Sequence, residues 1–429
     1  MKLMEVFRPR RKEAEVPAAS TSRVKKDVLE LDLPDIHTDI IEKVYDSPEM
    51  KERAYQAREN FQNADEVIAV TGSFGLGDCI MELRYVLQLA KKTQKNFLIQ
   101  LHPALLPLMN ANQEKFPNVQ FCDKVPTEKV QNKSTFLLRL TPTTRINESL
   151  NWLDWSQTGL DIEDYSEALR QKHFFDNRRK SASVADSDFF MPMFAHKQGQ
   201  DTMHDIKEKA FQSNPKANQF DQMYALMSAF LGEPVTAQEI MTSSILPYDK
   251  EILEDIPQTF DFIFAPDAGE RTNGQWSNKS LSPDVWSNIF ARPELKGKKV
   301  GIIKGIAHPK YCQAIFQLAL NNEVEVEMLN GNLNDISQQI LSTKCFVGMD
   351  SGTTHLALDV SRFAKQNGRS ILVKEIIDEY SASQVEEYGI TDTPILRYSH
   401  PQVVASTEMD FSHLAPEEVD QIGEYFLAA

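Results

Sequence analysis

The chain has 429 residues, of which 41% are hydrophobic and 25% are charged, so it can bury the cores of about two domains. Its formal net charge of −16 repels nucleic acid and anionic lipid, which argues against a general nucleic-acid binder unless a local basic patch overrides the field. The four cysteines, Cys79, Cys122, Cys312 and Cys345, show no CxxC spacing. Neither a zinc site nor a disulfide framework is predicted, and a reducing cytoplasm fits best.

Residues 1–64 are predicted to be an N-terminal extension, partly disordered and partly helical. The basic cluster Arg8 to Lys12 is followed by no apolar run of signal-peptide length, and no segment is long enough to span a membrane. Two interpretations of the cluster stay open, a solvated tail and a peripheral contact with the inner face of a membrane. One or two helices are predicted between 36 and 64 from the spacing of Ile40, Ile41, Val44, Ala54, Ala57 and Phe61.

From Glu66 the chain alternates strand-like and helix-like runs. The runs "EVIAVTG" and "NFLIQLH" flank the helical pattern "DCIMELRYVLQLAKKT", which is a βαβ unit and predicts a parallel sheet. A second series begins near Phe260, with the strand-like runs "FDFIFAPDA", "KKVGIIKGI", "VEVEML", "KCFVGMD" and "RSILVKEI". We therefore expect an α/β fold of two Rossmann-like domains with parallel sheets, over residues 65–248 and 249–429. An insertion near 141–215 and a helix at "QFDQMYALMSAFLG" are predicted between the two series.

The first strand runs into a glycine-rich turn with Gly72, Gly75 and Gly77. The spacing is GxxGxG rather than the dinucleotide-binding GxGxxG, and Asp78 stands where a P-loop has lysine, so neither phosphate-binding motif is predicted. Asp78 is placed at a helix N-terminus, which favours its ionised form. It is a candidate base, and the alternative is a cap for the following helix.

The run "CFVGMDSGTTHLAL" has a strand, then Asp350 to His355, then a helix. A turn of small residues that opens a helix presents N–H groups and hydroxyls, which suits a diphosphate. Ser351 lacks the GxSxG spacing of a hydrolase nucleophile, and His355 taken alone is typical of a structural histidine.

A polar loop follows the strand at Phe262 and ends where Ser282 and Pro283 give a strong helix-start signal. Arg271 and Lys279 in this loop could neutralise phosphates, or each could be a solvated surface charge.

Taken together, these stretches resemble family 9 of the glycosyltransferases, the heptosyltransferases of lipopolysaccharide core biosynthesis. The resemblance lies in "GLGD", "FAPDAG…NKSLSPDVW" and "LNGNLNDISQQILSTKCFVGMDSGTTHLAL", together with the helix "QFDQMYALMSAFLG". It implies a GT-B architecture of two facing Rossmann-like domains, and an inverting, metal-independent transfer of a sugar from a nucleoside diphosphate.

Site residues follow from this resemblance position by position. Asp78 would be the general base, and Lys279 would stabilise the leaving diphosphate. The residues implied to bind the donor are Gly77, Arg271, Asp350, Ser351, Gly352, Thr353, Thr354 and His355. No metal or cofactor is expected; the partners are a sugar nucleotide such as ADP-heptose and an acceptor hydroxyl on a glycan, a lipopolysaccharide core or a protein. The GT-A alternative rests on "DSD" at 186–188, which follows no strong strand.

The chain departs from the family pattern at four places. Arg84 replaces a proline, Leu281 a tryptophan and Asp267 a glycine, and the Gly-Pro loop after the "HLAL" helix is absent. Asp267 adds negative charge close to where a diphosphate would lie. A second hypothesis therefore stays open, a catalytically weakened GT-B protein that binds a sugar nucleotide or a protein partner.

Overall fold

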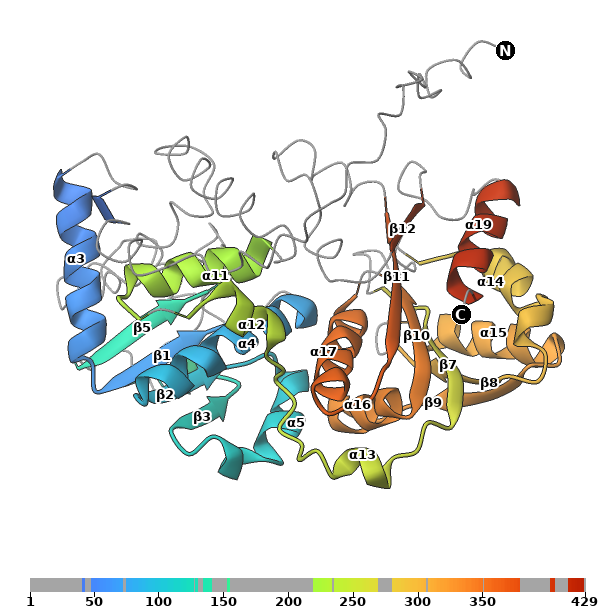
Figure 1. Cartoon of the computed structure of the whole chain (residues 1–429), viewed down its shortest axis with the longest axis horizontal. Coiled ribbons are helices and arrows are strands. Elements are labelled where there is room, and N and C mark those ends of the chain that lie inside the picture. The colour runs from blue at the N-terminus through green and yellow to red at the C-terminus, as the bar shows by residue number, and fades with distance from the viewer. Residues whose placement is uncertain are drawn as a thin grey trace, which may run out of the picture. The chain divides into compact units, whose positions relative to one another are not determined.

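The computed structural model describes residues 41–42, 48–71, 75–126, 128–129, 134–140, 153–154, 219–233, 235–268, 280–305, 308–349, 351–378, 402–405 and 416–427 (Figure 1). Most of the predicted N-terminal extension and nearly all of the 141–215 insertion, with its "DSD" run, lie outside these ranges. So do Arg271, Lys279 and Asp350, whose roles stay predictions. In the part that is described, no helix is long and apolar enough to cross a membrane.

Helix α3 (Pro48–Asn63) confirms the helix predicted before the first strand. Its apolar residues recur at helical spacing, and Ala54, Ala57 and Phe61 are all buried. The Phe61 ring meets the Phe136 ring edge to face, with centroids 5.1 Å apart. The helix is thereby packed against the first sheet.

The first sheet has four parallel strands, β1 (Glu66–Val70), β2 (Asn96–Gln100), β3 (Val119–Cys122) and β5 (Thr135–Arg139), in the order β3-β2-β1-β5. Helix α4 (Leu76–Thr93) connects β1 to β2, as predicted, and the short helix α5 (Leu106–Asn110) lies between β2 and β3. A two-residue pair, β4 (Val125–Pro126) and β6 (Leu153–Asp154), lies apart from this sheet. The predicted βαβ unit is confirmed.

Six parallel strands form the second sheet, β7 (Phe260–Ala265), β8 (Lys299–Ile303), β9 (Glu325–Leu329), β10 (Thr343–Met349), β11 (Leu372–Asp378) and β12 (Gln402–Ala405). Their order is β12-β11-β10-β7-β8-β9. The first five were predicted as strands, and β12 was not. Two parallel sheets confirm the predicted α/β class, whereas the domain boundaries stay predictions.

Helices cover both faces of the second sheet (Figure 1). Helices α16 (Leu333–Leu341) and α17 (Gly352–Gln366) share one core with Ile263 and Phe346. Helices α14 (Pro283–Phe290), α15 (Pro309–Asn321) and α19 (Pro416–Leu427) share the other with Phe264 and Val347. Alternate residues of one strand thus enter opposite cores, which explains the nearly continuous apolar runs in the sequence.

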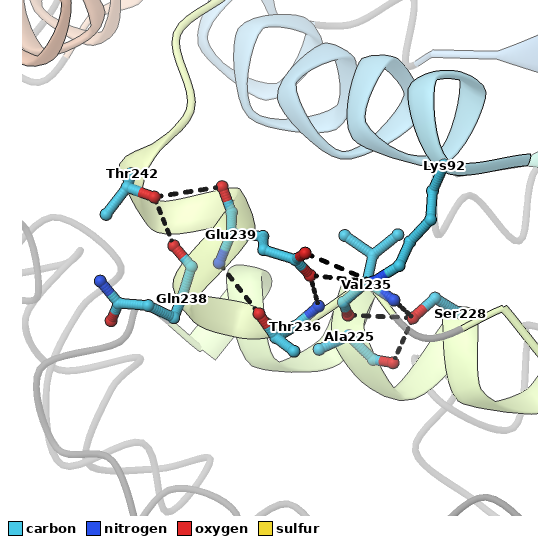
Figure 2. A network of polar contacts seen from close by, with 8 residues as sticks. All are labelled: Lys92, Ala225, Ser228, Val235, Thr236, Gln238, Glu239 and Thr242. Atoms are coloured by element: carbon cyan, nitrogen blue, oxygen red, sulfur yellow. Dashed lines mark hydrogen bonds and ion pairs between the residues drawn. The ribbon is translucent and has the colours of Figure 1, made fainter. Parts of the chain in front are cut away.

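The chain passes from the first sheet to the second through α11 (Gln219–Phe230), α12 (Ala237–Thr242) and α13 (Ile252–Asp255). Helix α11 confirms the predicted helix. The ring of its Tyr224 stacks on the Tyr85 ring of α4, with centroids 5.1 Å apart. Figure 2 shows the turn into α12, where Ser228 accepts from Val235 N and Lys92 pairs with Glu239 at 3.3 Å. The Tyr224–Tyr85 and Glu239–Lys92 contacts attach the connecting helices to α4, and the Ser228–Val235 bond joins α11 to the turn before α12.

Candidate functional site

The two sequence motifs follow strands at the points where strand order reverses. In the first sheet the chain goes from β1 through β2 to β3 in one direction, and β5 pairs on the other side of β1. In the second sheet it goes from β7 to β9 in one direction and from β10 to β12 in the other. Ligands of open α/β sheets bind outside the carboxyl ends of the strands at such switch points. The turns that lead into α4 and α17 therefore occupy the expected ligand positions.

Asp78 lies in the first turn of α4, with an exposed side chain. Gly75 takes the N-cap position with φ −135° and ψ 134°, so the interpretation of Asp78 as the capping residue is wrong: the helix begins at Leu76, and Asp78 is its third residue. The carboxylate folds back over Gly75, where an added Cβ would lie 2.7 Å from Oδ2. Its negative charge thus sits at the positive end of the helix dipole.

The turn into α17 is held by Thr354. Its hydroxyl donates to Met349 O at 2.5 Å, and Gly348 leaves room for it, because an added Cβ there would overlap Thr354 Oγ1. Ser351 is the N-cap, and Thr354 N and His355 N donate to Ser351 O at 3.0 and 3.1 Å. Thr354 is fully buried, so its observed role is structural, and its predicted donor contact stays a prediction.

Earlier N–H groups of α17, at Gly352 and Thr353, belong to the helix start, where no intrahelical acceptor exists. The side chains of Ser351 and Thr353 are partly exposed. This turn can therefore offer hydroxyls and N–H groups to an anion at the positive end of a 15-residue helix.

The two turns meet through glycines. An added Cβ on Gly77 would overlap the His355 ring and lie 2.9 Å from its Nε2, and one on Gly352 would lie 2.6 Å from Leu76 Cβ. The His355 side chain of α17 thus fills the space beside Gly77 of α4, and the Leu76 side chain of α4 fills the space beside Gly352 of α17. The His355 ring lies directly against Gly77 and is buried, and the donor contacts expected of both residues stay predictions.

Asp267, which follows β7, is buried and paired with His308. Its Oδ1 lies 3.1 Å from His308 Nδ1, and its Oδ2 accepts from His308 N at 3.2 Å. His308 is the N-cap of α15, and Pro309 at the first helical position is the only local sequence signal for it. Gly305 after β8 allows the approach, because an added Cβ would overlap Asp267. Asp267 was identified from the sequence, whereas His308 was not.

Cysteine chemistry is disfavoured here. Burial raises the pKa of Cys79 and of Cys122 to about 12, and that of Cys312 and of Cys345 to about 11, so none is a thiolate at neutral pH. Among the described residues no group of three or more His, Cys, Asp or Glu side chains could hold a metal ion.

Comparison with known proteins finds no matching protein-family profile and no matching curated protein. Solved structures do match. Escherichia coli ADP-heptose LPS heptosyltransferase II shares 14% identity at a TM-score of 0.45, over 84% of this chain and 98% of that chain. E. coli heptosyltransferase WaaC with ADP shares 12% identity at a TM-score of 0.47, over 84% of this chain and 97% of that chain. A glycosyl transferase family 9 protein from Veillonella parvula shares 11% identity at a TM-score of 0.43, over 85% of this chain and 98% of that chain. These values do not define the family, so the function is argued from this chain's own residues.

Proposed function

We propose that this protein is an inverting glycosyltransferase of GT-B architecture that moves a sugar from a nucleoside diphosphate to an acceptor hydroxyl. The observation that carries the proposal is the contact between the two helix-opening turns, one with an exposed carboxylate and the other with hydroxyl and N–H donors. These are the groups that such a transfer needs on opposite sides of the anomeric carbon.

The turn at Ser351 to Thr353 is the proposed diphosphate site. When the bond from the anomeric carbon to the phosphate oxygen breaks, negative charge grows on the diphosphate, and fixed donors at a helix N-terminus stabilise it. Arg271, Lys279 and Asp350 join this site on the strength of the sequence resemblance, the first two as cations and Asp350 at the sugar hydroxyls. With two cations in that role, the proposal requires neither a metal nor a cofactor.

Asp78 is the proposed general base. It takes the proton of the acceptor hydroxyl while the acceptor oxygen attacks the anomeric carbon and the diphosphate leaves with the bonding electrons. A single displacement from the face opposite the leaving group inverts the configuration at that carbon.

ADP-heptose is the donor to try first, because the resemblance is to heptosyltransferases of lipopolysaccharide core biosynthesis. The acceptor would be a lipopolysaccharide core precursor, another glycan or a protein, and the reaction would take place in the cytoplasm or at the inner face of the membrane. The second candidate, a weakened GT-B protein that binds without turnover, is favoured by one observation, the buried carboxylate of Asp267 after β7, the strand that pairs with β10.

Replacing Asp78 by asparagine tests the role of the base. The assay measures ADP release from ADP-heptose with a lipopolysaccharide-core precursor as acceptor, and calorimetry measures ADP binding. We expect turnover to fall by roughly 10²–10⁴-fold with ADP affinity unchanged.

Asp65→Asn is the matched control, because Asp65 is an exposed aspartate immediately before β1, at the opposite end of that strand. It should leave turnover unchanged. Equal turnover in Asp78→Asn and wild type would remove Asp78 as the base, and binding of ADP without turnover in the wild type would favour the second candidate.

A further inference from the structure

His102 lies at the carboxyl edge of the first sheet, where the chain also turns from β1 into α4. It comes two residues after the end of β2, and Gln100 at that end pairs with Val70 at the end of the parallel strand β1. The hydroxyl of Thr71, the next residue after β1, donates to Gln100 O at 2.7 Å and ties the two strand ends together. This is the edge of the sheet where the proposed transfer puts the acceptor.

The thiol of Cys79 places His102 beside the turn that carries Asp78. Burial raises the pKa of Cys79 to about 12, and among the smaller effects a hydrogen bond from the His102 N–H lowers that pKa and the Asp78 charge raises it. A hydrogen bond requires direct contact, so the His102 backbone lies against the residue that follows Asp78 in α4. His102 is therefore a neighbour of the proposed base.

The imidazole of His102 is held by the turn that follows it. Its Nδ1 accepts from Ala104 N at 3.2 Å, at the start of the short helix η1 (Pro103–Leu105). Nδ1 therefore carries no hydrogen, and in the neutral ring the hydrogen lies on Nε2. Burial lowers the pKa of His102 from its usual 6.5, so the ring is neutral at pH 7. The Nε2–H group is thus a fixed hydrogen-bond donor.

This donor is available to a ligand. The His102 side chain is only half-buried, and among the residues that the structure describes none accepts a hydrogen bond from Nε2. A sugar suits a donor beside a base, because its hydroxyls lie on neighbouring carbons: one can reach Asp78 while the next accepts from Nε2–H. A serine or threonine side chain has a single hydroxyl and cannot serve both groups.

We propose that His102 is an acceptor-binding residue, whose Nε2–H donates to a sugar oxygen next to the hydroxyl that Asp78 deprotonates. The inference rests on the proposed function, because it assigns His102 to the acceptor side of the same transfer. The acceptor class that it selects is a glycan with oxygens on neighbouring carbons. The bond forms in the ground state and in the transition state alike, so its loss weakens acceptor binding and leaves the chemical step unchanged.

Two amide variants separate the roles of the two ring nitrogens. His102→Asn keeps an acceptor near the place of Nδ1 for the Ala104 N–H and removes the Nε2–H donor. His102→Gln brings an amide N–H near the place of Nε2 and removes the Nδ1 acceptor. Thermal unfolding should therefore change less in His102→Asn than in His102→Gln. If His102→Gln does not fold, His102→Asn carries the test alone.

The assay measures transfer from ADP-heptose to a deacylated lipopolysaccharide-core precursor, with each substrate varied in turn. His102→Asn should raise the KM for the precursor on the order of tenfold and leave kcat and the KM for ADP-heptose within about twofold of wild type. His102→Gln should keep the KM for the precursor within about threefold. Asn96→Ala is the control, because Asn96 is exposed at the opposite end of β2, and it should change none of the three constants.

The outcomes separate this inference from the proposed function. If wild type transfers the sugar and His102→Asn keeps the wild-type KM for the precursor, or His102→Gln raises that KM as much as His102→Asn does, His102 has only a structural role and the inference is wrong. If wild type binds ADP but transfers nothing to the precursor, the glycan class assigned to the acceptor is wrong while the donor site stands. If wild type binds neither ADP nor ADP-heptose, the proposed function and this inference both fail.

Discussion

Single glycines decide how closely α4 and α17 approach. Gly77 faces the His355 ring and Gly352 faces Leu76, with no space for a methyl group at either position. The contact brings the Asp78 turn to the Ser351 turn, so the geometry of the proposed site depends on two residues with no functional group. Their role is steric, and it can be tested by adding one carbon.

Gly77→Ala should lower the free energy of unfolding by about 1–3 kcal/mol, because the added methyl overlaps a buried ring that must move. Urea denaturation measures the change. His355→Ala makes room, so the double variant Gly77→Ala/His355→Ala should cost less than the sum of the two single changes. Additive costs would show that the two residues do not meet.

Asp359 on α17 is a second residue with a specific structural role. It is fully buried, and its Oδ2 accepts from Ser244 Oγ at 2.6 Å and from Ile245 N at 3.0 Å, which holds the chain after α12 to α17. Burial raises the pKa of its carboxyl above the ordinary 3.8, against the opposing effects of Arg362, the Ser244 hydroxyl, Arg84 and the Ile245 N–H. Folding therefore favours its protonated form.

Asp359→Asn tests this pKa shift through the dependence of stability on pH. A raised folded-state pKa contributes stability that is fully present below the unfolded value of 3.8 and is lost as the pH rises through the folded value. Wild type should therefore gain stability relative to Asp359→Asn as the pH falls from 7 towards 4, measured by urea denaturation at each pH. The exposed Asp255→Asn is the control and should show no such gain. A constant difference between wild type and Asp359→Asn would contradict the shift.

At the scale of secondary-structure elements, side chains at the helix ends fix where a helix begins. Helix α12 has a capping box, in which Thr236 Oγ1 accepts from Glu239 N at 3.1 Å and Glu239 Oε2 accepts from Thr236 N at 2.6 Å (Figure 2). Burial alone would raise the pKa of Glu239, but the bonds from Thr236 and the Lys92 cation outweigh it and hold the pKa below 4.5. The box fixes the start of a six-residue helix that propensity alone would not stabilise.

Thr236→Ala should cost about 1 kcal/mol of stability, because it removes the cap acceptor. Thr242→Ala, on the same helix, is the matched control: its hydroxyl donates only to the carbonyls of Gln238 and Glu239, and its loss should change stability by less than about 0.5 kcal/mol. Chemical denaturation compares the two. Equal costs would mean that the box contributes nothing beyond an ordinary surface hydroxyl.

Local signals explain which elements could be predicted. The strands β7 to β11 are short apolar runs, and α14 begins as expected, with Ser282 Oγ accepting from Val285 N and Pro283 at the first helical position. The start of α4 was placed two residues late because Asp78 is a common capping residue, whereas the backbone makes Gly75 the cap. Strand β12 has no strong alternation of its own and takes its pairing from β11.

The candidate site could be predicted only in part, because only its local features leave a signal in the sequence. Strand-to-helix turns are visible locally, so Asp78 and Ser351 were identified. The Asp267–His308 pair joins residues 41 positions apart, and the Gly77–His355 contact joins the two halves of the chain. No local pattern encodes either contact, and both appear only once the strand order is known.

At the scale of the whole molecule, each of two parallel sheets places a motif turn at its switch point. In the proposed transfer, the second sheet binds the donor, and the first sheet binds the acceptor and carries the base. This division of labour requires that a nucleoside diphosphate bind the free protein.

The most direct test is thermal unfolding of the purified full chain with ADP, UDP, GDP or CDP, and with adenosine as the control that lacks phosphates. We expect one nucleoside diphosphate to stabilise the protein, by about 2.7 kcal/mol at a hundred times its Kd, and adenosine to have no such effect. A preference for ADP would support an ADP-heptose donor. If none of the four shifts the unfolding temperature, the second sheet has no donor site and the proposed transfer is wrong.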